Sequence, residues 1–214
     1  MTLAIPRLDR TTAEERGLTI ADFLVPIRVG ERVNARVRDV VLVVAGALLI
    51  YLTARVSIPV PGSPVPITGQ TLGVLLVGGA LGFRRGFSAV GLYVLLGVVG
   101  LPFFAEGKGG LSVVWGATGG YLIGFVIAGA LVGRLAELGW DRRIGGAIGA
   151  MLLGNVMIYA VGLPWLKVVT GMSVDETVAN GLTPFLVGDA LKLVLAAVLF
   201  PATWWIVDRR PDDR

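Results

Sequence analysis

The sequence contains neither cysteine nor histidine among its 214 residues. The absence of cysteine excludes disulfide bonds and thiol chemistry, and the absence of histidine removes the commonest general base and metal ligand. The chain also lacks the glycine-rich phosphate loop that ends in Gly-Lys-Ser or Gly-Lys-Thr, so it carries no nucleotide-hydrolysing site of that kind. We therefore expect no catalytic residue, no metal and no cofactor.

Charge is also scarce in this sequence. Only 16% of the residues are charged and 55% are hydrophobic, whereas an average soluble domain has about 25% charged residues. Charge-free runs long enough to cross a bilayer recur through the chain. They lack the alternation of polar and apolar residues that a membrane β-strand requires, and the 31 glycines suit closely packed membrane helices. The composition predicts an all-α polytopic membrane protein.

The apolar runs predict six transmembrane helices. Four prolines between residues 59 and 66 cannot continue a helix and predict a stiff loop after the first helix, and Pro164 is expected to end the fifth. The chain then divides into an N-terminal tail (1–39), a membrane domain (40–207) and a C-terminal tail (208–214). The predicted spans cover residues 40–58, 67–83, 86–101, 117–134, 144–163 and 183–207.

Positive charge is unevenly distributed along the chain. Fifteen of the 19 Lys and Arg residues lie in the tails or near the ends of the second and fourth spans. Because loops rich in Lys and Arg stay in the cytoplasm, we expect a cell-membrane protein with both termini cytoplasmic. Residues 1–39 lack the apolar segment of a signal peptide, and acidic residues interrupt their basic ones, which argues against nucleic-acid binding. The other four basic residues are Arg55, Lys108, Lys167 and Lys192.

The last predicted span carries two ionisable residues, Asp189 and Lys192. They are three residues apart, so they share a helix face and can reach each other. Ionisable groups at this depth are costly and usually face a bundle interior or an aqueous cavity. Pro184 fits the first helical position, which would place Asp189 beyond the first turn, where the helix dipole acts weakly. We interpret the pair as facing a ligand; the alternative is a self-paired couple that only orients the helix.

Further polar and aromatic residues fall in the same outer half of the bundle. Each has a structural alternative: an interhelical hydrogen bond, a helix cap, close packing at a glycine, or an aromatic at the membrane interface. Together with apolar walls they predict one cavity for a small amphipathic anion, whose carboxylate would suit the Lys192 ammonium. The candidate substrate-binding residues are Asp189, Lys192, Asn155, Tyr159, Gln70, Thr68, Trp115, Thr118, Gly119 and Tyr121.

Four stretches carry a resemblance to a known family. They resemble the BioY family, the biotin-specific substrate-binding (S) components of energy-coupling factor (ECF) transporters, and they occur in the family's order and spacing. The stretches are VPITGQTLG at residues 65–73, GVVGLPFF at 97–104, GATGGYLIG at 116–124 and PFLVGDALK at 184–192.

This resemblance implies a six-helix S-component fold with an outward cavity closed by the loops after the first, third and fifth spans. It implies biotin as the ligand, with Asp189 and Lys192 matching the family's polar pair in the biotin site. It also implies a transmembrane coupling (T) subunit and two cytoplasmic ATPases as partners, and a chain that is not itself an enzyme. The alternatives are an S component for another small vitamin, a membrane hydrolase that uses Asp189, and a structural bundle without a ligand.

Overall fold

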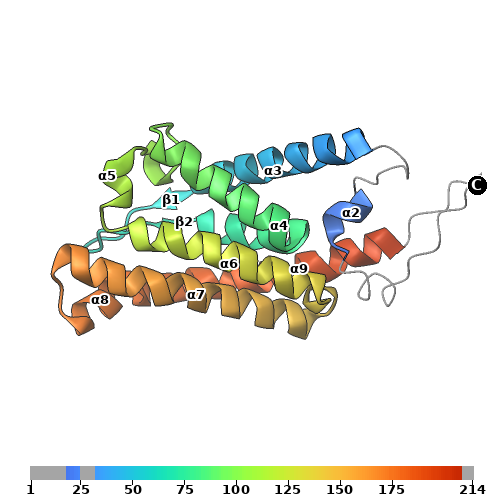
Figure 1. Ribbon diagram of the computed structural model, residues 1–214. Helices are drawn as coiled ribbons and strands as arrows, with labels where there is room; N and C mark the ends of the chain where they lie inside the picture. The colour runs from blue at the N-terminus through green and yellow to red at the C-terminus, as the bar shows by residue number, and fades with distance from the viewer. Residues whose placement is uncertain (1–17, 25–31, 209–214) are drawn as a thin grey trace, which may run out of the picture.

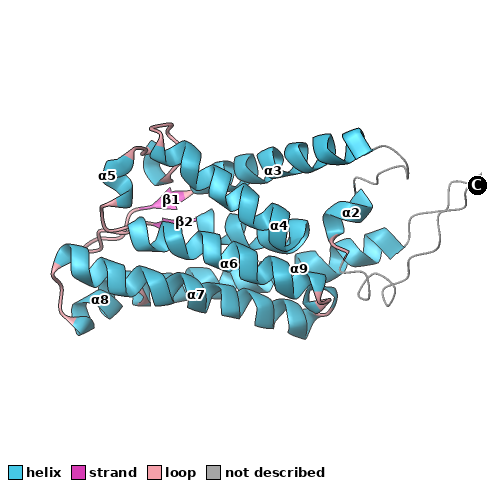
Figure 2. Ribbon diagram, in the orientation of Figure 1, coloured by secondary structure: helices cyan, strands magenta, loops and turns pink. Residues whose placement is uncertain are grey.

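The computed structural model describes residues 18–24 and 32–208. The other residues of the predicted tails lie outside this part of the chain. Long helices run side by side, and two very short strands lie at the end of the bundle that also holds α5 and α8 (Figures 1 and 2). The described elements are α2 (Ile20–Leu24), α3 (Arg32–Ala54), β1 (Ser57–Ile58), β2 (Ile67–Thr68), α4 (Gln70–Val98), η1 (Ala105–Gly107), α5 (Leu111–Val114), α6 (Gly119–Glu137), η2 (Trp140–Arg142), α7 (Ile144–Thr170), α8 (Val174–Gly181), η3 (Thr183–Phe185) and α9 (Leu186–Asp208).

Helix α4 reverses its direction at Gly82. This residue has φ 83° and ψ −179°, values that favour glycine because it has no Cβ. In a straight helix Gln70 and Tyr93 would be about 34 Å apart along the axis, yet their side chains form a hydrogen bond. The element therefore consists of two antiparallel arms, 70–81 and 83–98. Glu137 at the end of α6 supports the reversal, since its Oε1 accepts a hydrogen bond from the Phe83 backbone N–H at 2.9 Å.

The reversal reconciles the structure with the six predicted spans. Among the described residues, five helical segments are long and apolar enough to cross a membrane, and the segment that contains α4 is one of them. Its two arms correspond to the second and third predicted spans. With α3, α6, α7 and α9 they form the expected all-α membrane bundle.

Glycine backbones bring three of the helices into direct contact. A Cβ on Gly78 in α4 would lie 2.5 Å from the carbonyl oxygen of Gly129 in α6. One on Gly133 in α6 would lie 2.5 Å from the backbone carbon of Gly82, and one on Gly124 would lie 2.9 Å from Ile158 in α7. These distances are too short for any side chain, so the abundance of glycine serves close helix packing, as the composition indicates.

The prediction that Pro164 ends the fifth span is wrong. Helix α7 passes through Pro164 and continues to Thr170. Proline removes one backbone hydrogen bond, but membrane bundles tolerate this where neighbouring helices hold the segment. Leu166, just after the proline, is fully buried, and this packing offsets the lost hydrogen bond. Helix α7 therefore occupies the first part of the predicted loop 165–182, and a further helix, α8, occupies most of the rest.

The ends of the other helices also differ from the sequence-based bounds. Helix α3 begins at Arg32, eight residues before the predicted span. Part of the predicted N-terminal tail forms α2, in which Ile20 and Ala21 are buried. Asp22 of this helix pairs with Arg38 at 3.1 Å and with Arg85 at 2.8 Å. Helix α2 therefore packs on the end of the bundle that is opposite β1 and β2 (Figure 1).

Candidate substrate-binding site

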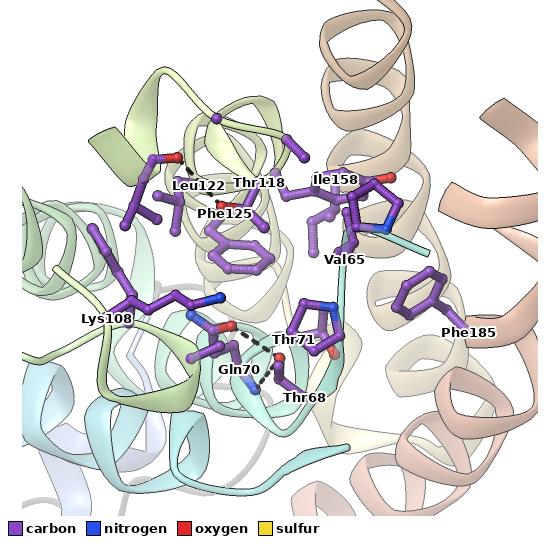
Figure 3. A pocket seen from close by; sticks show the side chains of 18 of the residues that line it. Val65, Thr68, Gln70, Thr71, Lys108, Thr118, Leu122, Phe125, Ile158 and Phe185 are labelled. Carbon is purple, nitrogen blue, oxygen red and sulfur yellow. Dashed lines mark hydrogen bonds between the residues drawn. The ribbon is translucent and has the colours of Figure 1, made fainter. Parts of the chain in front are cut away.

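A cavity of about 330 Å³ lies at the end of the bundle that carries β2 and α5. Residues from the loop 59–66, the first arm of α4, the segment 104–118, α6, α7, η3 and α9 line it. Its size and mixture of apolar walls with a few polar groups are typical of a small-molecule site. Figure 3 shows this lining. The apolar walls include Phe104, Leu122, Phe125, Ile158 and Phe185.

Asp189 and Lys192 both line this cavity and pair with each other. Lys192 Nζ lies 3.1 Å from Asp189 Oδ1 and 2.7 Å from Thr71 Oγ1. The Tyr159 hydroxyl donates a hydrogen bond to the other carboxylate oxygen, Oδ2. Asp189 is only 7% exposed, so these bonds offset much of the cost of burying its charge. An ammonium has three N–H donors, and the bonds to Asp189 and Thr71 use two of them, so a third can bind a ligand.

The start of α9 places Asp189 differently from the sequence-based prediction. A 3-10 turn, η3, covers residues 183–185, and α9 begins only at Leu186. Asp189 therefore lies in the first turn of the helix, where the positive end of the helix dipole favours a carboxylate. The predicted weak dipole effect is wrong for this reason. The Lys192 ammonium lies on the same side of the helix, 3.1 Å from Asp189 Oδ1.

A second polar group lies on the wall formed by β2 and the first arm of α4. The Thr68 hydroxyl donates to Gln70 Oε1 at 3.0 Å and accepts the Gln70 backbone N–H at 3.2 Å. Gln70 Nε2 donates to the hydroxyl of Tyr93, a fully buried residue on the second arm of α4. Figure 3 shows Thr68 and Gln70 joined by hydrogen bonds beside Thr71. Thr68 thus supports the start of α4 and also lines the cavity.

A second charged pair lies at the mouth of the cavity. Lys108 Nζ lies 2.5 Å from Glu106 Oε2, and the Lys108 side chain is 63% exposed. Both residues line the cavity. The cavity therefore has two ammonium groups: that of Lys192, bonded to Thr71 of α4 and Asp189 of α9, and that of Lys108, which is more exposed to solvent.

Loops cover part of the cavity on the side that faces away from the centre of the bundle. Pro64, Val65 and Pro66 line it, and the Ser63 hydroxyl donates to the carbonyl oxygen of Asn180 in α8 at 2.7 Å. Tyr121 from α6 donates to the carbonyl oxygen of Gly181 at 2.9 Å. The proline-rich loop and α8 are thereby joined to each other and to the helices below.

Seven of the ten candidate residues line this one cavity. Trp115 lies outside it, 68% exposed and stacked on Trp165 with ring centroids 6.0 Å apart. Gly119 serves close packing, because a Cβ there would lie 1.7 Å from the Val114 carbonyl oxygen. Asn155 lines a much smaller cavity that also includes Thr71 and Lys192. The seven that line the main cavity are Thr68, Gln70, Thr118, Tyr121, Tyr159, Asp189 and Lys192.

Several lining residues are absent from the sequence-based set. Thr71 directly follows Gln70 in the motif at residues 65–73, so its position in the motif could have indicated it. Glu106 and Lys108 lie in a glycine-rich loop that has no helical periodicity to orient them. The apolar residues, such as Phe125 and Phe185, resemble any other core residue in the sequence and carry no signal of their own.

Comparisons with known proteins give a consistent result. A sequence model of the BioY family matches residues 28–209. The chain is 35% identical over 170 residues to the biotin transporter BioY of Rhizobium etli, which covers 76% of this chain and 90% of that protein. It is 39% identical over 158 residues to the biotin transporter BioY of Thermotoga maritima, and this match covers 74% of this chain and 92% of that protein. A crystal structure of the S-component for biotin from an ECF-type ABC transporter superposes with a TM-score of 0.72 at 28% identity, covering 79% of this chain and 92% of that one.

Proposed function

This chain belongs to the BioY family, and on that basis we propose that it is the biotin-binding S component of an ECF transporter. It is a multi-pass membrane protein that binds and carries its substrate and does not transform it chemically. The observation that carries the proposal is a cavity of about 330 Å³ in which apolar walls surround the bonded group Tyr159–Asp189–Lys192. Biotin has matching parts: an apolar chain and fused ring, a cyclic urea, and one carboxylate.

We assign the carboxylate of biotin to the third N–H of Lys192. This ammonium is already fixed by Asp189 and Thr71, so a ligand carboxylate meets a preformed donor and little side-chain entropy is lost on binding. The apolar parts of biotin would pack on Phe125, Ile158 and Phe185. The urea would face Thr68 and Gln70, whose oxygen atoms can accept its N–H groups.

We further propose that the cavity faces the outside and that both termini are cytoplasmic. The described ends of the chain, α2 and the end of α9, lie together at the opposite end of the bundle from the cavity (Figure 1). Most of the basic residues belong to that end, which the positive-inside rule places in the cytoplasm. A coupling subunit and two ATPases would drive import from that side, since this chain has no phosphate loop of its own.

The direct test is ligand binding by the purified chain in detergent, without ATP or partner subunits. We expect saturable binding of biotin and none of thiamine, riboflavin or lipoate, measured by isothermal titration calorimetry. The variant Lys192→Met should bind biotin much more weakly. Lys167→Met is the matched control, because Lys167 lies in the last turn of α7 and does not line the cavity. Binding of another vitamin instead of biotin would overturn the assignment of the substrate.

Transport requires a separate measurement. The chain alone in liposomes should bind biotin but not accumulate it, and accumulation should appear when coupling subunit, ATPases and ATP are added. Concentrative uptake by the chain alone, with no ion gradient, would refute the proposed division of labour between the subunits.

A further inference from the structure

The hydroxyl group of Thr71 accepts one hydrogen bond and has its own hydrogen left to donate. Lys192 Nζ lies 2.7 Å from Thr71 Oγ1. An ammonium carries donors and no acceptor, so the direction of this bond is fixed and the Thr71 oxygen is the acceptor. A hydroxyl can also donate its one hydrogen, and no atom of residues 18–24 or 32–208 accepts it from Thr71.

Other threonines in the helices of this chain use their hydroxyl hydrogen locally. Thr53 and Thr203 each donate to a backbone carbonyl oxygen of the preceding helical turn, at 2.8 Å. Such a bond needs a turn of helix before the threonine. Thr71 is the second residue of α4, which begins at Gln70, so no helical turn precedes it. Its place at the start of the helix therefore leaves the hydroxyl hydrogen for another partner.

Thr71 and Lys192 are neighbours on the wall of the main cavity. Asn155 is the other polar residue beside them, in the smaller cavity, but among the described residues it forms no hydrogen bond with Thr71. The third N–H of Lys192 and the hydroxyl hydrogen of Thr71 thus belong to atoms only 2.7 Å apart. A carboxylate has two acceptor oxygens on one carbon, so it can accept from two neighbouring donors at once.

We propose that Thr71 and Lys192 form a two-donor site for one carboxylate, with the Thr71 hydroxyl as a second ligand-binding group. The inference rests on the proposed function and deepens it, because the carboxylate is that of biotin. Thr71 has two roles in this site. Its oxygen, together with Asp189, holds the Lys192 ammonium in one orientation, and its hydrogen is donated to the ligand.

The two-donor site favours an anion over a neutral ligand of the same shape. Hydrogen bonds to an ionised oxygen are roughly twice as strong as bonds between neutral groups. An ester also offers a carbonyl oxygen to the Thr71 hydroxyl, but that oxygen carries no charge. Both members of the site therefore contribute to the preference for a carboxylate, and Lys192 contributes more because it is charged.

The test is the variant Thr71→Val, which replaces the hydroxyl by a methyl group of similar size. Binding of biotin and of its methyl ester is measured by calorimetry in the parent chain and in the variant. We expect biotin affinity to fall about 10- to 100-fold, as for a lost bond to a charged group, and ester affinity only about 3- to 10-fold. Thr71→Ser keeps the hydroxyl and should bind biotin nearly as the parent chain does. Thr203→Val is the matched control, because the Thr203 hydroxyl is bonded within α9 and the residue does not line the cavity.

A double-mutant cycle with Lys192→Met separates direct donation from the positioning of Lys192. Lys192→Met removes the ammonium and leaves the Thr71 hydroxyl, which can donate to a carboxylate or to an ester carbonyl oxygen. In this background Thr71→Val should still lower the affinity for both ligands about 3- to 10-fold. If its effect disappears there, Thr71 acts only through Lys192 and the two-donor site is overturned.

The remaining outcomes also decide the inference. An unchanged biotin affinity in Thr71→Val, or an equal loss for biotin and its ester, would overturn the two-donor site and leave biotin binding by the parent chain intact. If Thr71→Val does not fold, Thr71→Ala gives the same comparison, since alanine also lacks the hydroxyl. Failure of the parent chain to bind biotin would overturn the proposed function and this inference with it.

Discussion

Tyr159 on α7 and Lys192 on α9 bind opposite oxygens of the same carboxylate, that of Asp189. The three side chains form one hydrogen-bonded unit at the wall of the cavity. Removing any member leaves another buried polar group without its partner. Lost affinity in a single variant therefore cannot by itself identify which group contacts the ligand, and each test needs a matched comparison.

The variant Tyr159→Phe should weaken biotin binding about tenfold or more. It removes the donor to Asp189 Oδ2, and a hydrogen bond to a charged group is worth about 1.5–3 kcal/mol. Tyr121→Phe is the comparison, because Tyr121 lines the same cavity but donates to the neutral carbonyl oxygen of Gly181. Titration calorimetry should show the smaller loss for Tyr121→Phe, and equal losses would contradict a special role for the Asp189 contact.

The position of the ligand carboxylate can be determined by comparing the affinities of biotin and its methyl ester in the parent chain and in lysine variants. In the parent chain the ester should bind much worse than biotin, since breaking a buried charge pair costs about 3–5 kcal/mol. In Lys192→Met the two ligands should bind about equally, both weakly. The rival position is the mouth of the cavity, at Lys108. If the ester penalty persists in Lys192→Met and disappears in Lys108→Met, the carboxylate lies at the mouth.

The orientation in the membrane can be tested with single cysteines, because the parent chain contains none. Asp175→Cys in α8 should react with a membrane-impermeant thiol reagent in intact cells, and Arg143→Cys should react only after lysis. Both positions are exposed in the structure. Arg142, its neighbour, is 2% exposed and would stay unlabelled on either side. The opposite labelling pattern would mean that the cavity faces the cytoplasm.

The glycine contacts predict a sharp difference between two substitutions in α4. Gly78→Ala places a Cβ 2.5 Å from the Gly129 carbonyl oxygen, and overpacking of this kind costs about 1–3 kcal/mol. A Cβ at Gly91 meets nothing within 4 Å, so Gly91→Ala should gain the better helix propensity of alanine. Thermal unfolding in detergent should show a lower midpoint for Gly78→Ala only; similar midpoints would argue against the close approach of α4 and α6.

The anchoring of α2 should depend on pH through Asp22. Burial alone would raise the pKa of this carboxyl, but the Thr19 backbone N–H and the Arg85 guanidinium outweigh it and hold the pKa below its ordinary value of 3.8. Asp22 therefore stabilises the fold above about pH 4, and this contribution is lost as the pH falls through the lowered pKa. Asp22→Asn should lower the unfolding midpoint at pH 7, with a difference from the parent that shrinks below pH 4. A difference that stays constant with pH would rule out the ion pairs as its source.

The sequence predicts what depends on neighbours along the chain. Asp189 and Lys192 are one helical turn apart in a chain with little charge, so their pairing follows from helix geometry alone. Helix α8 could also have been predicted, since Ser173 and Glu176 have the spacing of a capping box, and the structure contains that box. The contact of Gln70 with Tyr93 could not, because the predicted spans give the reversal of the chain but not which residues of the two arms of α4 face each other.

The continuation of α7 past Pro164 shows where a local sequence rule gives the wrong prediction. The local rule for proline is sound, but the burial of Leu166 and the hydrogen bond from the Trp165 indole to the Gly116 carbonyl oxygen hold the next turn in place. The hydrogen bond joins residues 49 positions apart in the sequence. Where tertiary packing outweighs a local preference, only the folded structure reveals the outcome.

The direct backbone contacts between α4 and α6 have a consequence for motion. At Gly78 and Gly129 no side chain separates the two helices, so no change of rotamer can loosen that seam. The two helices are therefore expected to move as one rigid plate. Helix α9 meets the plate through side chains, such as Phe200 against Gly79, and side chains can repack. Opening of the cavity would then proceed by displacement of α9 relative to the plate, and the polar wall of Thr68 and Gln70 would stay with the plate.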